Sequence, residues 1–127
     1  MSDVIREIET DKAPDAAGPY SQGIAYGNLV FTAGEIPVDP ADGKIPEGIE
    51  EQAELALRNT EAVLNAAGKC RALQVTVYLT DIRDFGTVNR IYAEHFGKPF
   101  PARSCIQAAA LPKGVKIMVS AIGALEE

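Results

Sequence analysis

The amino-acid sequence predicts an α+β fold with a mixed sheet and two helices packed on one face of that sheet. Two observations lead to this prediction. Apolar residues recur at helical spacing in two separate segments, and apolar and polar residues alternate with a period of two in other segments. Two helices are too few to cover both faces of a sheet, so we expect partner subunits to cover the other face.

The N-terminal half is predicted to contain a hairpin followed by a helix. Two short β-prone runs, residues 24–26 and 29–33, flank a Gly-Asn pair at residues 27–28, which is typical of a tight hairpin. Small and apolar residues then recur at helical spacing through residues 49–67. Gly68 follows and is suited to end this helix, because glycine adopts a left-handed backbone without strain.

The C-terminal half is predicted to add a strand, a helix and two strands, which makes the order ββαβαββ. Residues 75–80 read Val-Thr-Val-Tyr-Leu-Thr, the alternation of a strand. A second helix is expected to open at Asp84 and to be closed by Gly97. The last two strands are expected over residues 103–109 and 115–123.

Composition and charge exclude several classes of function. The chain has 127 residues, with 12 Lys and Arg against 18 Asp and Glu and a net charge of −6. A nucleic-acid partner is not expected, because such binding depends on basic residues that neutralise phosphates. No apolar run has the length of a membrane span or of a signal peptide. We expect one domain over residues 1–127, a cytoplasmic location and no membrane association.

Cysteine and histidine are too few to build a metal centre. Cys70, Cys105 and His95 match no zinc-ligand spacing, and a reducing compartment would keep both thiols free. We expect no metal and no disulfide. His95 and Cys70 are assigned structural roles, although the basic neighbours of Cys70 are expected to favour its thiolate.

One arginine stands among small and apolar residues in a predicted strand. Arg103, Cys105 and Gln107 share one face of this strand. A partly buried guanidinium cannot lose its charge, so it needs a carboxylate partner. The residues leave two alternatives open: a structural ion pair with Glu35 or Asp81, or a carboxylate of a bound ligand.

Two turn-rich segments are candidates to meet this strand. The segment AAGPYSQG forms a rigid loop that offers the aromatic ring and phenol of Tyr20. The segment FTAGEIP ends a strand at Gly34, where the missing side chain lets a ligand approach the backbone.

Three stretches together resemble the RidA (YjgF) family: APDAAGPYSQGI, FTAGEIPVDPADG, and the long run from VTVYLTDI through FPARSC to LPKGVKI. The resemblance implies a chorismate-mutase-like fold, assembled as a barrel-like homotrimer with ligand clefts between subunits. It also implies hydrolysis of reactive 2-imino acids and their enamine tautomers, such as 2-aminoacrylate and 2-iminobutanoate, to 2-keto acids and ammonia. No cofactor is implied.

The resemblance also implies roles for individual residues. Arg103 would clamp the substrate carboxylate, and Tyr20 would reach in from the neighbouring subunit. The backbone at Gly34 and Cys105 would hold the imine end and a water molecule, and Asn89 matches a further polar position beside the cleft.

The sequence departs from the family at the residue thought to orient the water. The family's IEIEAIA reads IMVSAIG here, so that Ser120 replaces the second glutamate, and serine is far too weak an acid or base to substitute for a carboxylate. The segment 68–75 is also shorter than usual.

This departure leaves two functions open. One is an imine deaminase in which water addition needs no acid and Ser120 holds the water. The alternative is a non-catalytic binder of small keto acids or related carboxylates. A third activity attached to the family, endoribonuclease, is disfavoured by the acidic charge balance and by the absence of paired histidines.

Overall fold

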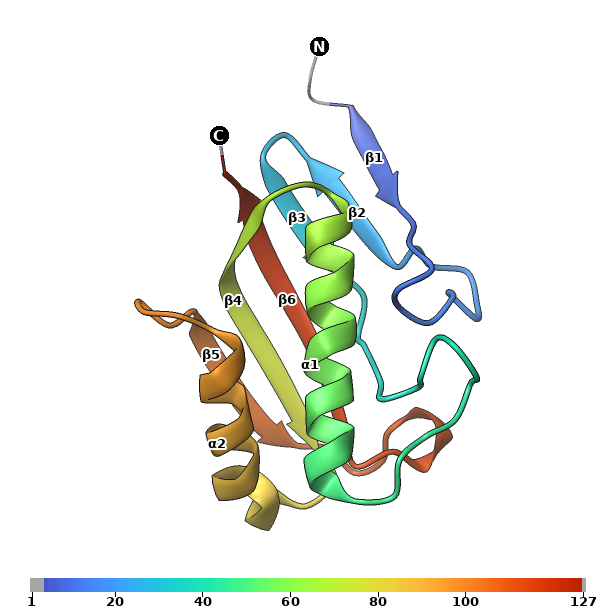
Figure 1. Cartoon of the computed structure of the whole chain (residues 1–127), viewed down its shortest axis with the longest axis vertical. Coiled ribbons are helices and arrows are strands. Elements are labelled where there is room, and N and C mark those ends of the chain that lie inside the picture. Colours follow the sequence, from blue (N-terminus) through green and yellow to red (C-terminus); the bar gives the residue numbers. More distant parts are fainter. Residues whose placement is uncertain (1–3, 127) are drawn as a thin grey trace.

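The computed structural model describes residues 4–126 and shows one six-stranded sheet with two helices on one of its faces (Figure 1). The strands are β1 (Ile5–Ile8), β2 (Gly23–Tyr26), β3 (Leu29–Thr32), β4 (Cys70–Leu79), β5 (Ala102–Gln107) and β6 (Ile117–Leu125), and the helices are α1 (Ile49–Ala66) and α2 (Phe85–His95). The predicted α+β architecture, with both helices on one face, is confirmed.

The sheet is mixed, and its strand order places β5 at one edge and β1 at the other. The order is β1-β2-β3-β6-β4-β5. Only β4 and β5 pair in parallel, and α2 forms the crossover that such a pair requires. All other neighbours pair antiparallel. The predicted hairpin is present between β2 and β3, with Gly27 at a φ of 60° in its turn.

Three elements differ from the predictions. The prediction placed no strand before residue 24, but β1 pairs with β2 at the edge, and its mostly exposed residues leave little apolar pattern to detect. The strand predicted at residues 75–80 begins at Cys70, where exposed residues and a bulge between Ala72 and Gln74 interrupt the alternation. The second helix ends at His95, and Phe96 is already extended, so Gly97 does not cap it.

The core lies between α1 and the sheet. The buried face of α1 comprises Gln52, Ala53, Leu55, Ala56, Leu57, Asn59, Thr60, Val63 and Leu64. Of these, Ala53, Ala56, Leu57, Val63 and Leu64 pack in one apolar cluster with Val30, Val75, Val77 and Val119 of the sheet. The small alanines let the helix lie close to the strands, and burial of this stripe stabilises the two-layer arrangement.

The other face of the sheet has no helix on it. Phe31 and Ile106 point to this face and are 39% and 49% exposed. Between them, Ser104, Thr76 and Ser120 form a row of hydroxyl groups on three adjacent strands, because Thr76 is paired with both serines. A single chain therefore leaves a sheet face of mixed apolar and hydroxyl character in contact with solvent.

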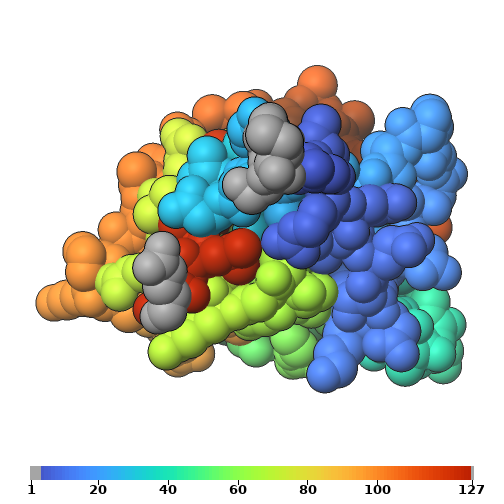
Figure 2. Space-filling model, turned by 90° about the horizontal axis from the view of Figure 1, so that it is seen from above, coloured from blue at the N-terminus to red at the C-terminus, as the bar shows by residue number. Residues whose placement is uncertain are grey.

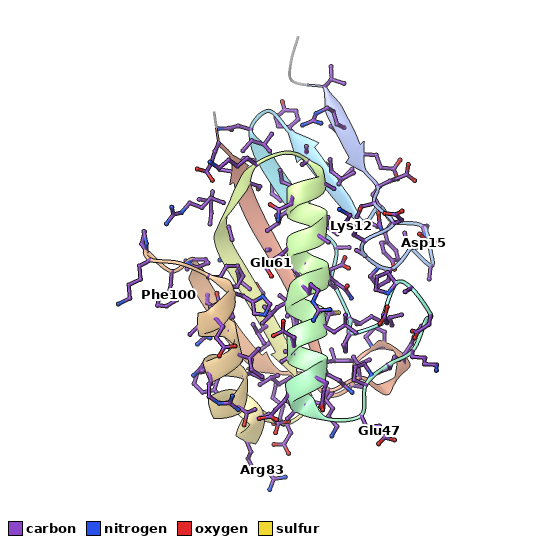
Figure 3. All side chains as sticks on the ribbon, viewed as in Figure 1. Lys12, Asp15, Glu47, Glu61, Arg83 and Phe100 are labelled. Carbon is purple, nitrogen blue, oxygen red and sulfur yellow. The ribbon has the colours of Figure 1, made fainter. Side chains whose placement is uncertain are left out.

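A histidine joins the two helices. His95 at the end of α2 contacts two carboxylates of α1, with Nδ1 at 2.5 Å from Glu61 Oε1 and Nε2 at 2.9 Å from Glu54 Oε1. Figure 3 shows Glu61 on the side of α1 that faces α2. The hydrogen bond to Glu61, assisted by Glu54, raises the pKa of His95 from 6.5 to about 9. The structural role expected for His95 is thus that of a charged link.

This link predicts an alkaline loss of stability. The folded chain holds the His95 proton more tightly than the unfolded chain, so the stabilisation is complete below pH 6.5 and is lost as the pH rises through about 9. We expect His95→Asn to lower the free energy of unfolding by roughly 2 kcal/mol under mildly acidic conditions and by much less above about pH 9.5. Urea denaturation at the two pH values measures this difference. Glu94→Gln, an exposed change on the same helix, serves as the control, and equal His95→Asn effects at both pH values would contradict the assignment.

Candidate functional site

Arg103 lies on edge strand β5 and faces α2. Its Cα is paired with that of the buried Val75, so its side chain points to the face that carries the helices. Nη1 donates a hydrogen bond of 2.6 Å to Oδ1 of Asn89. The guanidinium carbon lies 4.8 Å from the ring centre of Tyr92 and 5.3 Å from that of Phe85. The arginine is therefore half-buried against two aromatic rings, which attract a cation through their π-faces.

The helical repeat explains why these three residues of α2 meet one arginine. Phe85, Asn89 and Tyr92 are spaced by four and three residues, which places them on one face of the helix. This spacing was visible in the sequence. Asn89 was predicted at the cleft, but the contact of the two rings with Arg103 was not, because their apolar spacing is equally typical of a core stripe.

Arg103 makes no ion pair within residues 4–126. The alternative of a structural ion pair with Glu35 or Asp81 is therefore wrong. Asp81 pairs with Arg83 at 2.8 Å, and Glu35 is buried elsewhere. Of the five N–H donors of a guanidinium, Arg103 uses one within the described chain. Such a group is suited to grip a carboxylate that the chain itself does not supply.

Cys105 shares the face of Arg103, as predicted, and its thiol remains protonated. Burial raises the pKa of the Cys105 thiol, and the nearby Arg103 opposes this effect only in part. Burial likewise raises the pKa of Cys70, so the expectation that its basic neighbours favour a thiolate is wrong. Both cysteines are free. Neither thiol is therefore suited to act as a thiolate nucleophile. The backbone of Cys105 can still form hydrogen bonds to a ligand.

Tyr20 and Gly34 lie in a different part of the chain and border one hollow of about 350 Å³. Tyr20 is 53% exposed, and its hydroxyl accepts a hydrogen bond of 3.2 Å from the backbone of Ala17. Gly34 lies against Met118, and a Cβ added at Gly34 would come within 2.7 Å of the Met118 sulfur. The space that a side chain would take at Gly34 is thus filled by Met118 of the same chain, and not left free for a ligand as the sequence predicted.

Glu35 borders the same hollow and is a residue whose role the sequence analysis missed. Its backbone forms a bridge with Val119 of β6, and the residue is only 5% exposed. Burial raises the pKa of its carboxyl group from 4.5 to about 8. The sequence could not reveal this burial, because the bridge joins residues far apart in the chain.

Ser120 lies on β6 and points to the uncovered face of the sheet. It borders a small hollow of about 100 Å³ together with Thr32, Gln74 and Thr76. Arg103 points to the opposite face, toward α2. Ser120 and Arg103 of one chain therefore cannot contact the same small ligand.

The predicted site residues form two groups that one chain does not bring together. Arg103, Asn89 and Cys105 form the arginine group, and Tyr20 and Gly34 form the tyrosine group. A row of paired backbone positions, Glu35–Val119–Val77–Cys105, runs from the residue after Gly34 to Cys105 of the arginine group. This row crosses three strand spacings, or about 14 Å.

The figures show the same separation. The β5 edge and the loop of residues 9–22 lie at opposite sides of the molecule (Figure 1). Seen from above, the segments near residues 98 and 18 project in opposite directions (Figure 2). Phe100, just before β5, and Asp15, in the loop of Tyr20, are likewise on opposite sides (Figure 3).

Within residues 4–126 no group of three or more His, Cys, Asp or Glu side chains could hold a metal ion. None of the helices in this part of the chain is long and apolar enough to cross a bilayer.

A small α+β protein with a half-buried arginine at a sheet edge, without an ion-pair partner among residues 4–126, is suited to binding a small carboxylate. The chain belongs to the RidA (YjgF) family, because the family described as Endoribonuclease L-PSP matches its residues 10–125. TdcF of Escherichia coli strain K12 is 46% identical over 120 residues, which cover 91% of this chain and 93% of that protein. The 2-iminobutanoate/2-iminopropanoate deaminase of the same strain is 43% identical over 122 residues, with coverages of 92% and 95%.

A solved structure agrees with these matches. The crystal structure of E. coli TdcF with bound serine has a TM-score of 0.90 to this chain at 44% identity, covering 96% of this chain and 99% of that one. The resemblance predicted from the sequence motifs is confirmed.

The ring under Arg103 allows a test of the packing. The Tyr92 hydroxyl is buried without a hydrogen-bond partner among the described residues, so its removal leaves no other group unpaired. We expect Tyr92→Phe to leave the free energy of unfolding unchanged or to raise it by up to about 1 kcal/mol. Tyr92→Ala, which also removes the ring, should cost about 3–5 kcal/mol. Thermal unfolding distinguishes the two, and a clear loss of stability in Tyr92→Phe would show that the hydroxyl has a partner.

Proposed function

We propose that this protein hydrolyses small 2-imino acids, and the enamines in equilibrium with them, to 2-keto acids and ammonia. The observation that carries the proposal is Arg103, a half-buried cation that pairs with no carboxylate of residues 4–126 and is held by Asn89 and two aromatic rings. The names of the relatives support it, since one of them is a 2-iminobutanoate/2-iminopropanoate deaminase. TdcF was crystallised with serine, which carries the same type of carboxylate.

The complete site in this proposal lies between two subunits of a homotrimer. Two features support this arrangement. Within one chain, the row from Glu35, next to Gly34, to Cys105, beside Arg103, crosses three strand spacings, or about 14 Å, which is too wide for one small ligand to span. The uncovered sheet face with Phe31 and Ile106 also has the apolar character of a surface that other subunits cover. Arg103 of one subunit then meets Tyr20 and Gly34 of the next.

Each group has a distinct task in this mechanism. Arg103 binds the substrate carboxylate through paired hydrogen bonds and neutralises its charge. Asn89 orients the guanidinium, and the ring of Tyr20 closes the cleft on the neighbour's side. The backbone at Gly34 and Cys105 holds the imine nitrogen and a water molecule. These contacts place water next to the electrophilic carbon, which replaces a random encounter by an oriented one.

The reaction itself is addition followed by elimination. Water oxygen bonds to C2 of the protonated imine while the electron pair of the C=N bond moves to nitrogen, and loss of one water proton gives a neutral carbinolamine. After the amino group takes up a proton, the C–N bond breaks as the hydroxyl oxygen forms the C=O bond and releases its proton, and ammonia leaves. Ser120 of the neighbouring subunit is proposed to hydrogen-bond the water from its uncovered sheet face. A protonated imine is electrophilic enough for water to attack it once both are oriented.

One observation favours a second candidate function, a non-catalytic carboxylate binder. Ser120 occupies the position at which the family carries the glutamate expected to orient the water. The adjacent residues of the hydroxyl row, Thr76 and Ser104, do not supply a carboxyl group in its place. A protein with the arginine group intact and no working acid or base would bind keto acids without turning over imines.

The first test removes the charge of Arg103. We expect Arg103→Ala to weaken binding of 2-ketobutyrate by about 10- to 100-fold, because charged hydrogen bonds contribute about 1.5–3 kcal/mol. Release of keto acid from freshly generated 2-iminobutanoate should fall at least as much. Calorimetry and a coupled keto-acid assay measure the two effects. Arg90→Ala is the matched control, since Arg90 lies on the exposed side of α2 and pairs with the exposed Glu50. Unchanged binding of 2-ketobutyrate by Arg103→Ala would contradict the proposal.

The second test separates the enzyme from the binder by Ser120→Glu. If the wild type turns over imines, the added carboxylate should change kcat by less than about tenfold. If the wild type only binds, the same change should raise turnover by about 10²–10⁴-fold from background, the usual contribution of a positioned acid or base. Keto-acid release by both proteins, measured side by side, decides between the two functions.

A further inference from the structure

Glu35 is the only acidic or basic residue of the described chain that is classed as buried. Its backbone N–H donates to the carbonyl of Val119 at 2.6 Å, and its carbonyl accepts from the N–H of Val119 at 3.0 Å. These two bonds fix the position of the residue. No donor or cation of residues 4–126 contacts its carboxyl oxygens, and burial without a partner is costly for a charged group.

The carboxyl group therefore keeps its proton in neutral solution. Burial raises its pKa to about 8, and no hydrogen bond or neighbouring charge offsets this effect. A carboxylic acid of this kind can donate a proton at neutral pH and take it back, which a serine hydroxyl cannot do. Groups with a pKa near the working pH are the most effective proton-transfer catalysts.

The position of Glu35 connects it to the proposed cleft. It directly follows Gly34, and both border the hollow of about 350 Å³ that also contains Tyr20. The other titratable groups that border this hollow are Asp15, Tyr20, Asp39 and Lys113. Asp15 is exposed, and Asp39 accepts a backbone hydrogen bond within its own turn. Glu35 is thus the carboxyl group of the hollow that is both buried and unpartnered.

We propose that Glu35 is the proton donor and acceptor of this site, and that it supplies the acid-base function that Ser120 lacks. This inference rests on the proposed imine hydrolysis. Gly34 and Glu35 come from the subunit that contributes Tyr20, so the acid would act from the side of the cleft opposite Arg103. The imine nitrogen, held at the Gly34 backbone, would then lie beside the carboxyl group.

The proton transfers balance over one turnover. The Glu35 carboxyl protonates the imine nitrogen and becomes a carboxylate. This carboxylate accepts a proton from the water molecule whose oxygen bonds to C2, which gives the neutral carbinolamine and restores the carboxyl group. The carboxyl then protonates the amino group. As the C–N bond breaks, the carboxylate accepts the hydroxyl proton, so that ammonia and the keto acid leave and Glu35 is again protonated.

The test replaces Glu35 with glutamine, which has the same shape and no proton to exchange. We expect Glu35→Gln to lower kcat for 2-iminobutanoate by about 10²–10⁴-fold, while 2-ketobutyrate still binds through Arg103. The ratio of wild-type to variant turnover should fall as the pH rises through about 8, where Glu35 loses its proton. The pH dependence that comes from protonation of the substrate is the same for both proteins, so it cancels in this ratio. Asp15→Asn changes an exposed acid of the same hollow and should leave turnover unchanged.

The outcomes separate this inference from the proposed function. An active wild type with an equally active Glu35→Gln variant refutes the role of Glu35 and leaves the deaminase intact. A wild type without turnover refutes both. The fold of the variant is checked by thermal unfolding. Between pH 4.5 and about 8, Glu35 ionises in the unfolded wild type but not in the folded wild type, which lowers the stability of the wild type as the pH rises. Glutamine does not ionise in either state. The Tm of Glu35→Gln relative to that of the wild type should therefore rise over this pH range.

A second measurement applies even if Glu35→Gln does not fold. The carboxyl carbon of Glu35 is followed by NMR in the wild-type protein during a pH titration, with and without 2-ketobutyrate. We expect the product to shift its resonance and its titration midpoint. If 2-ketobutyrate changes neither the resonance position nor the titration midpoint of Glu35, the inference is wrong.

Discussion

The site depends on the way the chain holds one positive charge without neutralising it. Arg103 cannot lose its proton, so a half-buried position must compensate the cost of removing the guanidinium from water. The aromatic rings of α2 and the amide oxygen of Asn89 compensate part of it. A carboxylate from the chain would compensate more, yet it would also occupy the group. The structure uses weaker partners and keeps the arginine available.

The alternation of a β-strand determines what else can reach this arginine. Residues one position apart in register point to opposite faces, so the hydroxyl row containing Ser120 and the arginine group are separated by the sheet itself. The hollow with Tyr20 and Glu35 is separated from the arginine group by the width of the central strands. In the proposed assembly, a second copy of the chain brings these surfaces into contact.

The sequence predicted those features that follow from local patterns. Gly27 marked the hairpin, the apolar period marked both helices, and alternation placed Arg103 and Cys105 on the same face. Strand β1 could not be predicted in this way, because its pairing with β2 supplies what its exposed residues do not show. The same limit applies to Glu35. Its burial comes from a backbone bridge to β6, a contact between residues 84 positions apart (119 − 35).

The motifs predicted the family, and the resemblance already placed Tyr20 on a neighbouring subunit and not beside Arg103 of its own chain. The strand register gives the physical reason within one chain, because the central strands separate Gly34 from Arg103. The choice between an ion pair and a free arginine also required coordinates, since composition offers many carboxylates and none of those within residues 4–126 forms an ion pair with Arg103.

Because the arginine group and the tyrosine group occupy different edges, every subunit of a closed ring would take part in two clefts, one with each neighbour. A subunit with defects in both groups would then inactivate the two clefts that it shares with its neighbours. In a mixed population, activity would decline faster than the fraction of defective subunits rises, so a damaged copy would act as a dominant inhibitor of intact ones.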